Sequence, residues 1–245
     1  MVTERFRAGW HVGRVVSRRP ETASAVRLEI EVPTWPGNHA GSHLDIRLTA
    51  PDGYQASRSY SIASSGPATR VVLAVDEVPS GEVSPYLVHD LVEGDELEVH
   101  GPLGRYFVWT PDDPDPAPVQ LIAGGSGVVP LYAMAAARER EARGPDFRLL
   151  YSVRTPDDVF FTDELAALTA TSIDVVHTRR APAGSARPPG RLTGESLAAS
   201  IFPATAMPRI YVCGPTPFVE TVAGWLSQLG HDPSRIRTER FGGSG

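Results

Sequence analysis

One short stretch, Arg58-Ser59-Tyr60-Ser61-Ile62-Ala63-Ser64, places a cation, a flat aromatic ring and hydroxyl groups on a single extended segment. A strand alternates its side chains, so the even-numbered residues should point one way and the odd-numbered residues the other. A guanidinium can hold a phosphate through paired hydrogen bonds, and a hydroxyl can bond a ring nitrogen. The segment suits a nucleotide with a planar redox ring. The alternative is an ordinary strand with one exposed arginine.

A second candidate site is the loop Gly124-Gly125-Ser126-Gly127, which follows a short apolar strand at 119–123 and opens a helix. Glycines let the backbone approach a pyrophosphate, and a helix N-terminus adds partial positive charge. Pro130 stands where the usual dinucleotide fingerprint has its third glycine, and proline suits the first turn of a helix. The pattern predicts a nucleotide loop of unusual form. The alternative is a purely structural turn.

Polar residues end the next two predicted strands. Ser152 and Arg154 close the strand at 147–152, and Thr178 and Arg179 follow the strand at 173–176. The acidic residue that would bond an NAD ribose is missing from the first of these ends. Hydroxyls and arginines suit a ribose 2′-phosphate, so NADP(H) is favoured over NAD(H).

The single cysteine follows a predicted strand at 209–213, in Cys213-Gly214-Pro215. This position puts Cys213 at the ligand edge of a parallel sheet; the alternative is a small buried hydrophobe. No histidine lies nearby in sequence to activate it as a nucleophile. The chain ends in Glu239-Arg240-Phe241 and four small residues, a polar composition that usually frays.

Composition narrows the function classes. The 245 residues carry 41% hydrophobic residues, enough for one large domain or two of ordinary size, and a net charge of −6 argues against nucleic acid as a partner. No apolar run is long enough for a bilayer, and the N-terminus lacks the apolar core of a signal peptide. We therefore expect a cytoplasmic protein that does not bind membranes.

Metal chemistry is not expected. One cysteine excludes an internal disulfide and a built-in iron–sulfur cluster, which needs about four cysteine ligands. His39 and His43 stand four apart, but the prolines and glycines around them favour a loop. We interpret both as surface histidines.

The pattern of the chain changes at a proline-rich stretch, which predicts a linker at 113–118 between domains at 1–112 and 119–245. Before the linker, short alternating segments at 26–32, 44–48, 70–75 and 96–99 predict an antiparallel barrel or sandwich with one short helix at 84–91. After it, strands alternate with helices at 131–143, 163–168, 194–200 and 217–229, which predicts a doubly wound parallel sheet.

Taken together, these motifs resemble the ferredoxin–NADP reductase family, in order and over nearly the whole chain. Arg58-Ser59-Tyr60-Ser61 is similar to its Arg-x-Tyr-Ser flavin motif, and Gly81-Glu82-Val83-Ser84 to its Gly-x-x-Ser motif. Residues 125–130 are similar to its Gly-x-Gly-x-x-Pro nucleotide loop, and 213–215 to its Cys-Gly-Pro motif. Residues 239–241 resemble its terminal Glu-x-aromatic. The resemblance implies an antiparallel β-barrel flavin domain followed by a Rossmann-like nucleotide domain.

The resemblance also implies roles for these residues. Catalysis falls to Ser61, Cys213 and Glu239. The flavin, FAD rather than FMN, is bound by Arg58, Ser59, Tyr60, Ser61, Gly81, Val83, Ser84 and Phe241. The nicotinamide nucleotide is bound by Gly124, Gly125, Ser126, Gly127, Ser152, Arg154, Thr178, Arg179, Cys213, Gly214 and Pro215. The chain continues four residues past Phe241, where plant-type members stop at the aromatic.

The implied function is an NAD(P)H-dependent flavin oxidoreductase. Hydride passes from nicotinamide C4 to flavin N5, and electrons then go to a separate acceptor such as a ferredoxin, an oxygenase or another redox protein. Alternatives are a reductase of free flavin or another small acceptor, and a flavin-binding electron-transfer subunit of a larger complex. A monomer is expected.

Overall fold

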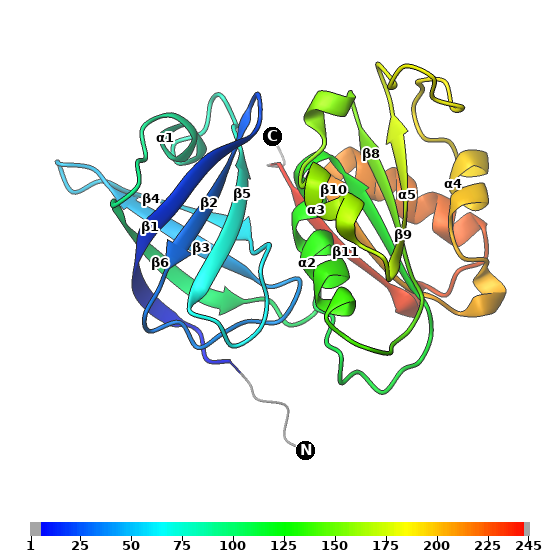
Figure 1. Cartoon of the computed structure of the whole chain (residues 1–245), viewed down its shortest axis with the longest axis horizontal. Coiled ribbons are helices and arrows are strands. Elements are labelled where there is room, and N and C mark those ends of the chain that lie inside the picture. Colours follow the sequence, from blue (N-terminus) through cyan, green and yellow to red (C-terminus); the bar gives the residue numbers. More distant parts are fainter. Residues whose placement is uncertain (1–5, 243–245) are drawn as a thin grey trace. The chain divides into compact units, whose positions relative to one another are not determined.

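The computed structural model describes residues 6–242, in two compact units that divide between Trp109 and Thr110. The start of the N-terminal segment that carried the signal-peptide prediction, and the last three residues of the tail, lie outside the described residues. Each unit has its own sheet and its own hydrophobic core (Figure 1).

The first unit is an antiparallel six-stranded sheet in the order β4-β3-β6-β1-β2-β5. Its elements are β1 (Gly9–Thr22), β2 (Ala25–Glu31), β3 (His43–Thr49), β4 (Gln55–Ser61), β5 (Arg70–Asp76), α1 (Ser84–His89) and β6 (Glu96–Leu103). Past the end of β4, Ile62 pairs with Leu73 of β5, and the Ala63 amide donates to the Val72 carbonyl at 2.8 Å. The two edges of the sheet therefore meet, which gives the predicted barrel.

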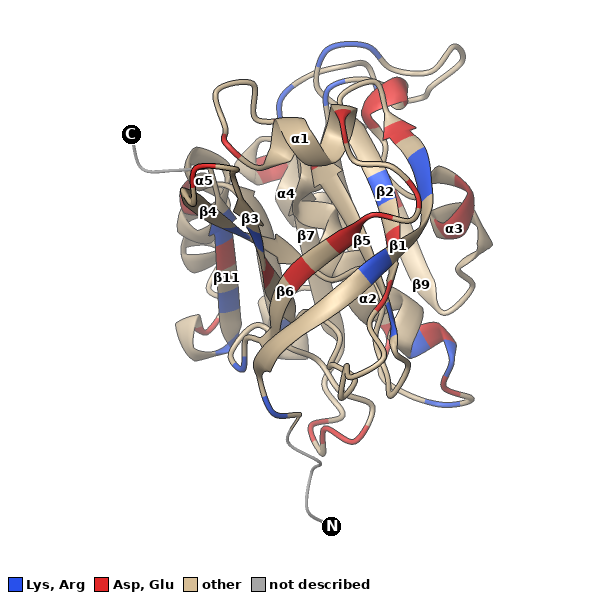
Figure 2. Cartoon of the chain, turned by 90° about the vertical axis from the view of Figure 1, so that its left-hand side faces the viewer, with Lys and Arg blue, Asp and Glu red and all other residues tan. Residues whose placement is uncertain are grey.

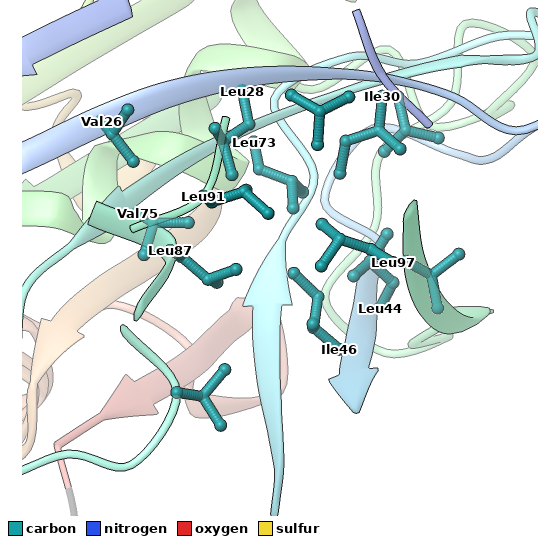
Figure 3. Packing of buried hydrophobic residues seen from close by; sticks show 14 of the residues in the cluster. Val26, Leu28, Ile30, Leu44, Ile46, Leu73, Val75, Leu87, Leu91 and Leu97 are labelled. Atoms are coloured by element: carbon teal, nitrogen blue, oxygen red, sulfur yellow. The ribbon is translucent and has the colours of Figure 1, made fainter. Parts of the chain in front are cut away.

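The core of this unit is built from apolar residues at every second position of its strands. Leu28 and Ile30 on β2, Leu44 and Ile46 on β3, and Leu73 on β5 are fully buried. Figure 3 shows these side chains converging with Leu87 and Leu91, from α1 and the turn after it. Burial of each such side chain contributes about 1.5–3 kcal/mol of hydrophobic free energy. The strands are fixed in register because a slip of one residue would turn this apolar set toward water.

The second unit is a parallel five-stranded sheet in the order β11-β10-β7-β8-β9. Its strands are β7 (Val119–Gly124), β8 (Phe147–Val153), β9 (Thr171–His177), β10 (Arg209–Pro215) and β11 (Ile236–Phe241). Its helices are α2 (Val128–Glu139), α3 (Thr162–Ala167), α4 (Gly194–Ser200) and α5 (Thr216–Gln228). α4 and α5 share one buried cluster on one face of the sheet, and Figure 1 shows α2 and α3 on the other. The predicted fold class, a β-domain followed by a doubly wound α/β domain, is confirmed.

The proline-rich stretch is tied to the second unit by buried and half-buried charges. Arg209, which is 7% exposed, pairs with Asp113 at 2.5 Å. Asp115 pairs with Arg235 at 2.7 Å, and the Ala117 amide also bonds the Asp115 carboxylate. These contacts hold the pKa of Asp115 below its ordinary value, with the Ala117 amide as the largest cause. Truncating Asp113 would leave the buried Arg209 guanidinium with only the more distant Asp115 carboxylate, at 4.0 Å, and a poorly compensated charge is costly when buried.

Two strands were missed by the sequence analysis. β1 runs through Pro20 and carries irregularities between Val15 and Ser17 and between Pro20 and Thr22, so its apolar period is broken. β11 holds the residues that we expected to fray. Its polar sequence forms an ordered edge strand because each of its residues pairs in register with β10. α2 also begins three residues before the predicted start and includes Pro130 in its first turn.

Candidate active site

The edge strand β4 presents the first candidate motif. Arg58 keeps half of its side chain exposed; its Nη1 donates to the Ser57 carbonyl at 2.7 Å, and its Nη2 pairs with Glu82 Oε2 at 2.5 Å. Tyr60 lies on the same side of the strand, half-buried against the barrel core, and burial raises the pKa of its phenol. A cation and a neutral aromatic ring thus stand two residues apart, as the alternation predicted.

The opposite side of β4 carries hydroxyls. Ser59 donates to Asp45 Oδ1 at 2.5 Å, so its hydroxyl hydrogen is already used within the barrel. Ser61 stands directly opposite His43 in the antiparallel register of β3 and β4. Residues opposite each other in such a ladder share one face of the sheet.

His43 is a residue that the sequence analysis undervalued. It is half-buried rather than on the surface, and desolvation, partly opposed by Asp45, lowers the pKa of its imidazole. His43 therefore stays neutral at pH 7 beside Ser61. The alternation His43, Asp45, Arg47 against Leu44, Ile46, Leu48 was the available signal, because it puts His43 on the polar face of β3.

The second motif forms a tight loop before α1. A Cβ atom on Gly81 would stand 3.0 Å from the Val78 carbonyl oxygen, closer than side chains ordinarily pack. The Ser84 hydroxyl accepts from the Val78 amide at 3.0 Å, and the Val83 side chain is fully buried in the barrel core. Ser84 and Val83 thus shape the loop, and Glu82 is the side chain that projects from it toward β4.

Glu82 joins the two motifs of the first unit. Its Oε2 pairs with Arg58, and its Oε1 accepts from the Tyr54 hydroxyl at 2.6 Å. The Tyr54 hydrogen bond is the larger of the causes that hold the pKa of Glu82 below its ordinary value, and Arg58 is the next. Glu82 occupies a variable position of the Gly-x-x-Ser motif, so the motif by itself did not predict these contacts.

In the second unit the glycine loop has two kinds of glycine. Gly124 and Gly127 have neighbouring residues packed closely against them. An added Cβ would stand 2.8 Å from Phe218 at Gly124 and 2.3 Å from the Cys213 carbonyl oxygen at Gly127. Gly125 has a φ of +55° and open space at its Cβ position. The backbone of Gly125 and Ser126, just before the twelve-residue helix α2, is therefore the part of the loop that a phosphate can approach.

Neighbouring strands bring the C-terminal motifs together. Cys213 pairs with Glu239 of β11 on one side and with Ala123 of β7 on the other, and Pro215 pairs with Phe241. Cys213 is 1% exposed, and burial, reinforced by Glu239, raises the pKa of its thiol well above the ordinary value. Burial also raises the pKa of Glu239 to about 7. The cysteine is a neutral thiol, beside a carboxyl group that titrates near neutrality.

Gly214 completes this motif in a confined position. A Cβ on Gly214 would stand 2.8 Å from the Phe218 ring, which also packs over Gly124. Phe241 is 36% exposed at the end of β11. Its backbone is held in the sheet while its ring remains accessible.

The ends of β8 and β9 gather the remaining predicted residues. Amides of residues 178 and 179 donate to the carbonyls of Val153 and Arg154 at 2.8 and 2.9 Å, which brings Arg154, Thr178 and Arg179 to one corner. Arg154 and Arg179 are exposed, whereas Ser152 is buried opposite Gly124. Arg180, beside them, is paired with Asp157. The corner offers two exposed guanidinium groups.

Residues 6–242 contain no group of three or more histidine, cysteine, aspartate or glutamate side chains that could hold a metal ion. Within the same residues, no helix has the length and apolar character needed to cross a membrane. Figure 2 shows that charged residues of both signs are spread over the strands of the first unit, including the β1 and β6 pair that Arg14 and Glu96 bridge at 2.8 Å.

Comparison with known proteins identifies both units. Residues 17–108 match the oxidoreductase FAD-binding domain, and residues 121–224 match the oxidoreductase NAD-binding domain. The FAD- and NAD-binding oxidoreductase domains predicted from the sequence are thereby confirmed.

Individual relatives agree. The chain is 32% identical to ferredoxin–NADP reductase B of Sorangium cellulosum, over 82% of this chain and 84% of that protein. It is 31% identical to the glycine betaine monooxygenase reductase subunit of Chromohalobacter salexigens, over 84% of this chain but only 56% of that subunit. The FAD/NAD-binding domain of nitric oxide dioxygenase from Vibrio cholerae shares the fold, with a TM-score of 0.81 at 24% identity over 97% of this chain and 100% of that one. The chain belongs to the ferredoxin–NADP reductase family.

Proposed function

We propose that this protein is an NADPH-dependent flavoprotein reductase that passes electrons to a separate carrier protein or oxygenase. The observation that supports this most is the surface of β4, where the exposed Arg58 cation and the partly exposed Tyr60 ring lie on the same side of the strand. The Gly81–Ser84 loop reaches Arg58 through Glu82. These are the groups that a phosphate and a planar ring require.

The residues of the first unit fit FAD. Arg58 would hold a phosphate, the backbone around Gly81 would approach it, and Tyr60 would lie against the isoalloxazine ring. Ser61 would bond the flavin near N5, and the neutral His43 opposite it would keep that hydroxyl in a polar but uncharged setting. Bound FAD would supply the redox chemistry, accepting a hydride and releasing electrons one or two at a time.

The second unit would hold the nicotinamide nucleotide. The backbone at Gly125 and Ser126, with open space at the Gly125 Cβ position, would approach the pyrophosphate. Arg154, Thr178 and Arg179 would offer cations and a hydroxyl to the adenosine end. Two exposed guanidinium groups at that corner favour a 2′-phosphate, and hence NADPH over NADH.

Cys213 and Glu239 would act near the nicotinamide. The buried thiol, kept neutral by its surroundings, offers a polarisable contact and no charge. Glu239 would hold or release a proton near pH 7 because burial has moved its pKa there. Phe241, whose ring is partly exposed at the end of β11, would offer an aromatic face to a planar ring of a cofactor.

Two relatives indicate the kind of acceptor. One relative is named as the reductase subunit of a glycine betaine monooxygenase and another as a ferredoxin–NADP reductase. By analogy with these relatives, electrons would leave the flavin for a separate protein of the ferredoxin or oxygenase kind.

A direct test is anaerobic reduction. The purified chain loaded with FAD should lose its yellow colour on addition of NADPH, faster than with an equal amount of NADH. Released flavin identified by chromatography should be FAD. A flavin that NADPH and NADH both fail to bleach would refute the proposal.

The second candidate is a reductase of free flavin, and one observation favours it. The guanidinium of Arg58 is engaged by Glu82, an arrangement that weakens the hold on a flavin phosphate. Loss of flavin during gel filtration, with undiminished reduction of added flavin, would support this alternative. Flavin retained at equal stoichiometry would support the leading proposal.

A further inference from the structure

The guanidinium of Arg58 is paired with the carboxylate of Glu82 at the position where the proposed site would hold a phosphate. Its Nη2 reaches Glu82 Oε2 at 2.5 Å, and its Nη1 is held by the Ser57 carbonyl at 2.7 Å. A phosphate binds a guanidinium most strongly through two parallel hydrogen bonds. Ser57 and Glu82 thus use two of the five N–H groups of Arg58, and the Glu82 carboxylate occupies the Nη2 side of the guanidinium. A phosphate that binds on that side must compete with Glu82.

Glu82 is not a loose surface carboxylate. The Tyr54 hydroxyl donates to its Oε1 at 2.6 Å, so each carboxylate oxygen has its own donor. The carboxylate comes from the loop that must approach the phosphate, since Gly81 precedes it and Ser84 fixes the loop through Val78. A negative charge is thus anchored at the point where a second negative charge would arrive.

We propose that Glu82 is an affinity- and specificity-determining residue, an internal competitor that flavin phosphate must displace from Arg58. The proposal rests on the function proposed above, because it takes Arg58 as the phosphate ligand. The displacement is feasible, because the side chains of Arg58 and Glu82 are 51% and 45% exposed and such pairs are weak. Glu82 therefore lowers the affinity for phosphorylated flavins and leaves the uncharged part of the flavin unaffected.

The chain offers a matched control. Glu98 lines the same groove as Glu82 and Tyr54, a space of about 560 Å³, and is similarly exposed at 43%. Its carboxylate is held by a different arginine, Arg47, at 2.8 and 3.0 Å. Glu82→Gln and Glu98→Gln each remove one negative charge from this groove, and only the first frees Arg58.

The experiment measures dissociation constants of FAD, FMN and riboflavin for the flavin-free full chain, by quenching of flavin fluorescence. Glu82→Gln should tighten FAD and FMN by about three- to tenfold, the range expected for losing a half-exposed ion pair and a like-charge contact. Riboflavin, which has no phosphate, should change by less than about twofold. Glu98→Gln should leave all three constants at the wild-type values.

Three results would overturn the inference while leaving the proposed function standing: unchanged FAD affinity in Glu82→Gln, weakened FAD affinity in that variant, or equal tightening of riboflavin and FAD. Wild-type protein that binds neither FAD nor FMN would instead refute the proposed function, and the inference with it. Glu82 is exposed and glutamine has the same shape, so the variant should fold; an unchanged melting temperature would verify this.

Discussion

Replacing Gly127 with alanine should damage the second unit more than any substitution at a freely exposed glycine. The added Cβ would stand 2.3 Å from the Cys213 carbonyl oxygen and 2.5 Å from its carbonyl carbon. Ordinary contact begins near 3.4 Å, so β10 and the loop would have to separate by roughly 1 Å. The obstacle is backbone in the middle of a sheet, which cannot rotate away as a side chain can.

The size of the effect follows from this geometry. Overpacking a core costs about 1–3 kcal/mol, and a clash with fixed backbone belongs at the upper end. About 3 kcal/mol corresponds to a fall of roughly 6–12 °C in melting temperature for a chain of this size. Cys213 would shift together with its carbonyl, so a loaded enzyme should also reduce its flavin more slowly, by up to about 10²-fold for a 1 Å displacement.

The assay is calorimetric melting of the full chain, with Gly224→Ala as the control. Gly224 is exposed within α5, and nothing lies within 4 Å of its Cβ position. Alanine there should stabilise the chain by about 0.5–1 kcal/mol, because a helical glycine is entropically costly. The two glycine-to-alanine changes should therefore move the melting temperature in opposite directions. A Gly127→Ala variant as stable as wild type would refute the proposed packing of the loop against Cys213.

Three further predictions concern the second unit. Cys213→Ala should retain flavin but slow its reduction by NADPH by roughly tenfold or more in stopped-flow measurements, through lost positioning; reduction at the wild-type rate would remove the role proposed for the thiol. Burial raises the pKa of Glu239 to about 7, so the folded chain keeps a proton that the unfolded chain releases near pH 4.5. Its contribution to the free energy of unfolding therefore falls as pH rises from about 4.5 to 7, by at most about 3 kcal/mol. In Glu239→Gln this part of the pH dependence should disappear when denaturation is measured at pH 5 and pH 8. An unaltered pH dependence of stability would contradict the assignment. Arg179→Gln should raise KM for NADPH by about tenfold, as expected for a charged hydrogen bond, and leave KM for NADH nearly unchanged; an equal rise for both nucleotides would argue against contact with the 2′-phosphate.

The sequence predicted elements best where one period dominated. Residues 26–32 alternate strictly and form β2, and residues 119–123 form the buried strand β7 before the glycine loop. Pro130 was compatible with the first turn of a helix, and α2 includes it there. At these positions the local sequence pattern and the tertiary packing favour the same element, so the pattern alone was enough to predict it.

β1 and β11 were missed for a different reason. A strand whose neighbours supply most of its burial needs few apolar residues of its own, and Ile236, which is 9% exposed, is the one buried residue of β11. Its order comes from pairing with β10, a contact between residues more than twenty positions apart. Local sequence carries no sign of such a contact.

The sequence alone determined the order of the motifs and the kinds of groups they bring: a cation and a ring at Arg58 and Tyr60, glycines before a helix, and a thiol at a strand end. Only the tertiary structure decided which of those groups remain available. In the folded chain Cys213 is buried beside Glu239, Gly124 and Gly127 are closely packed by their neighbours, and Glu82 forms an ion pair with Arg58. The reason is physical: a residue's chemistry is set by its type, whereas its charge state and its partners depend on burial and on neighbours that folding brings from distant parts of the chain.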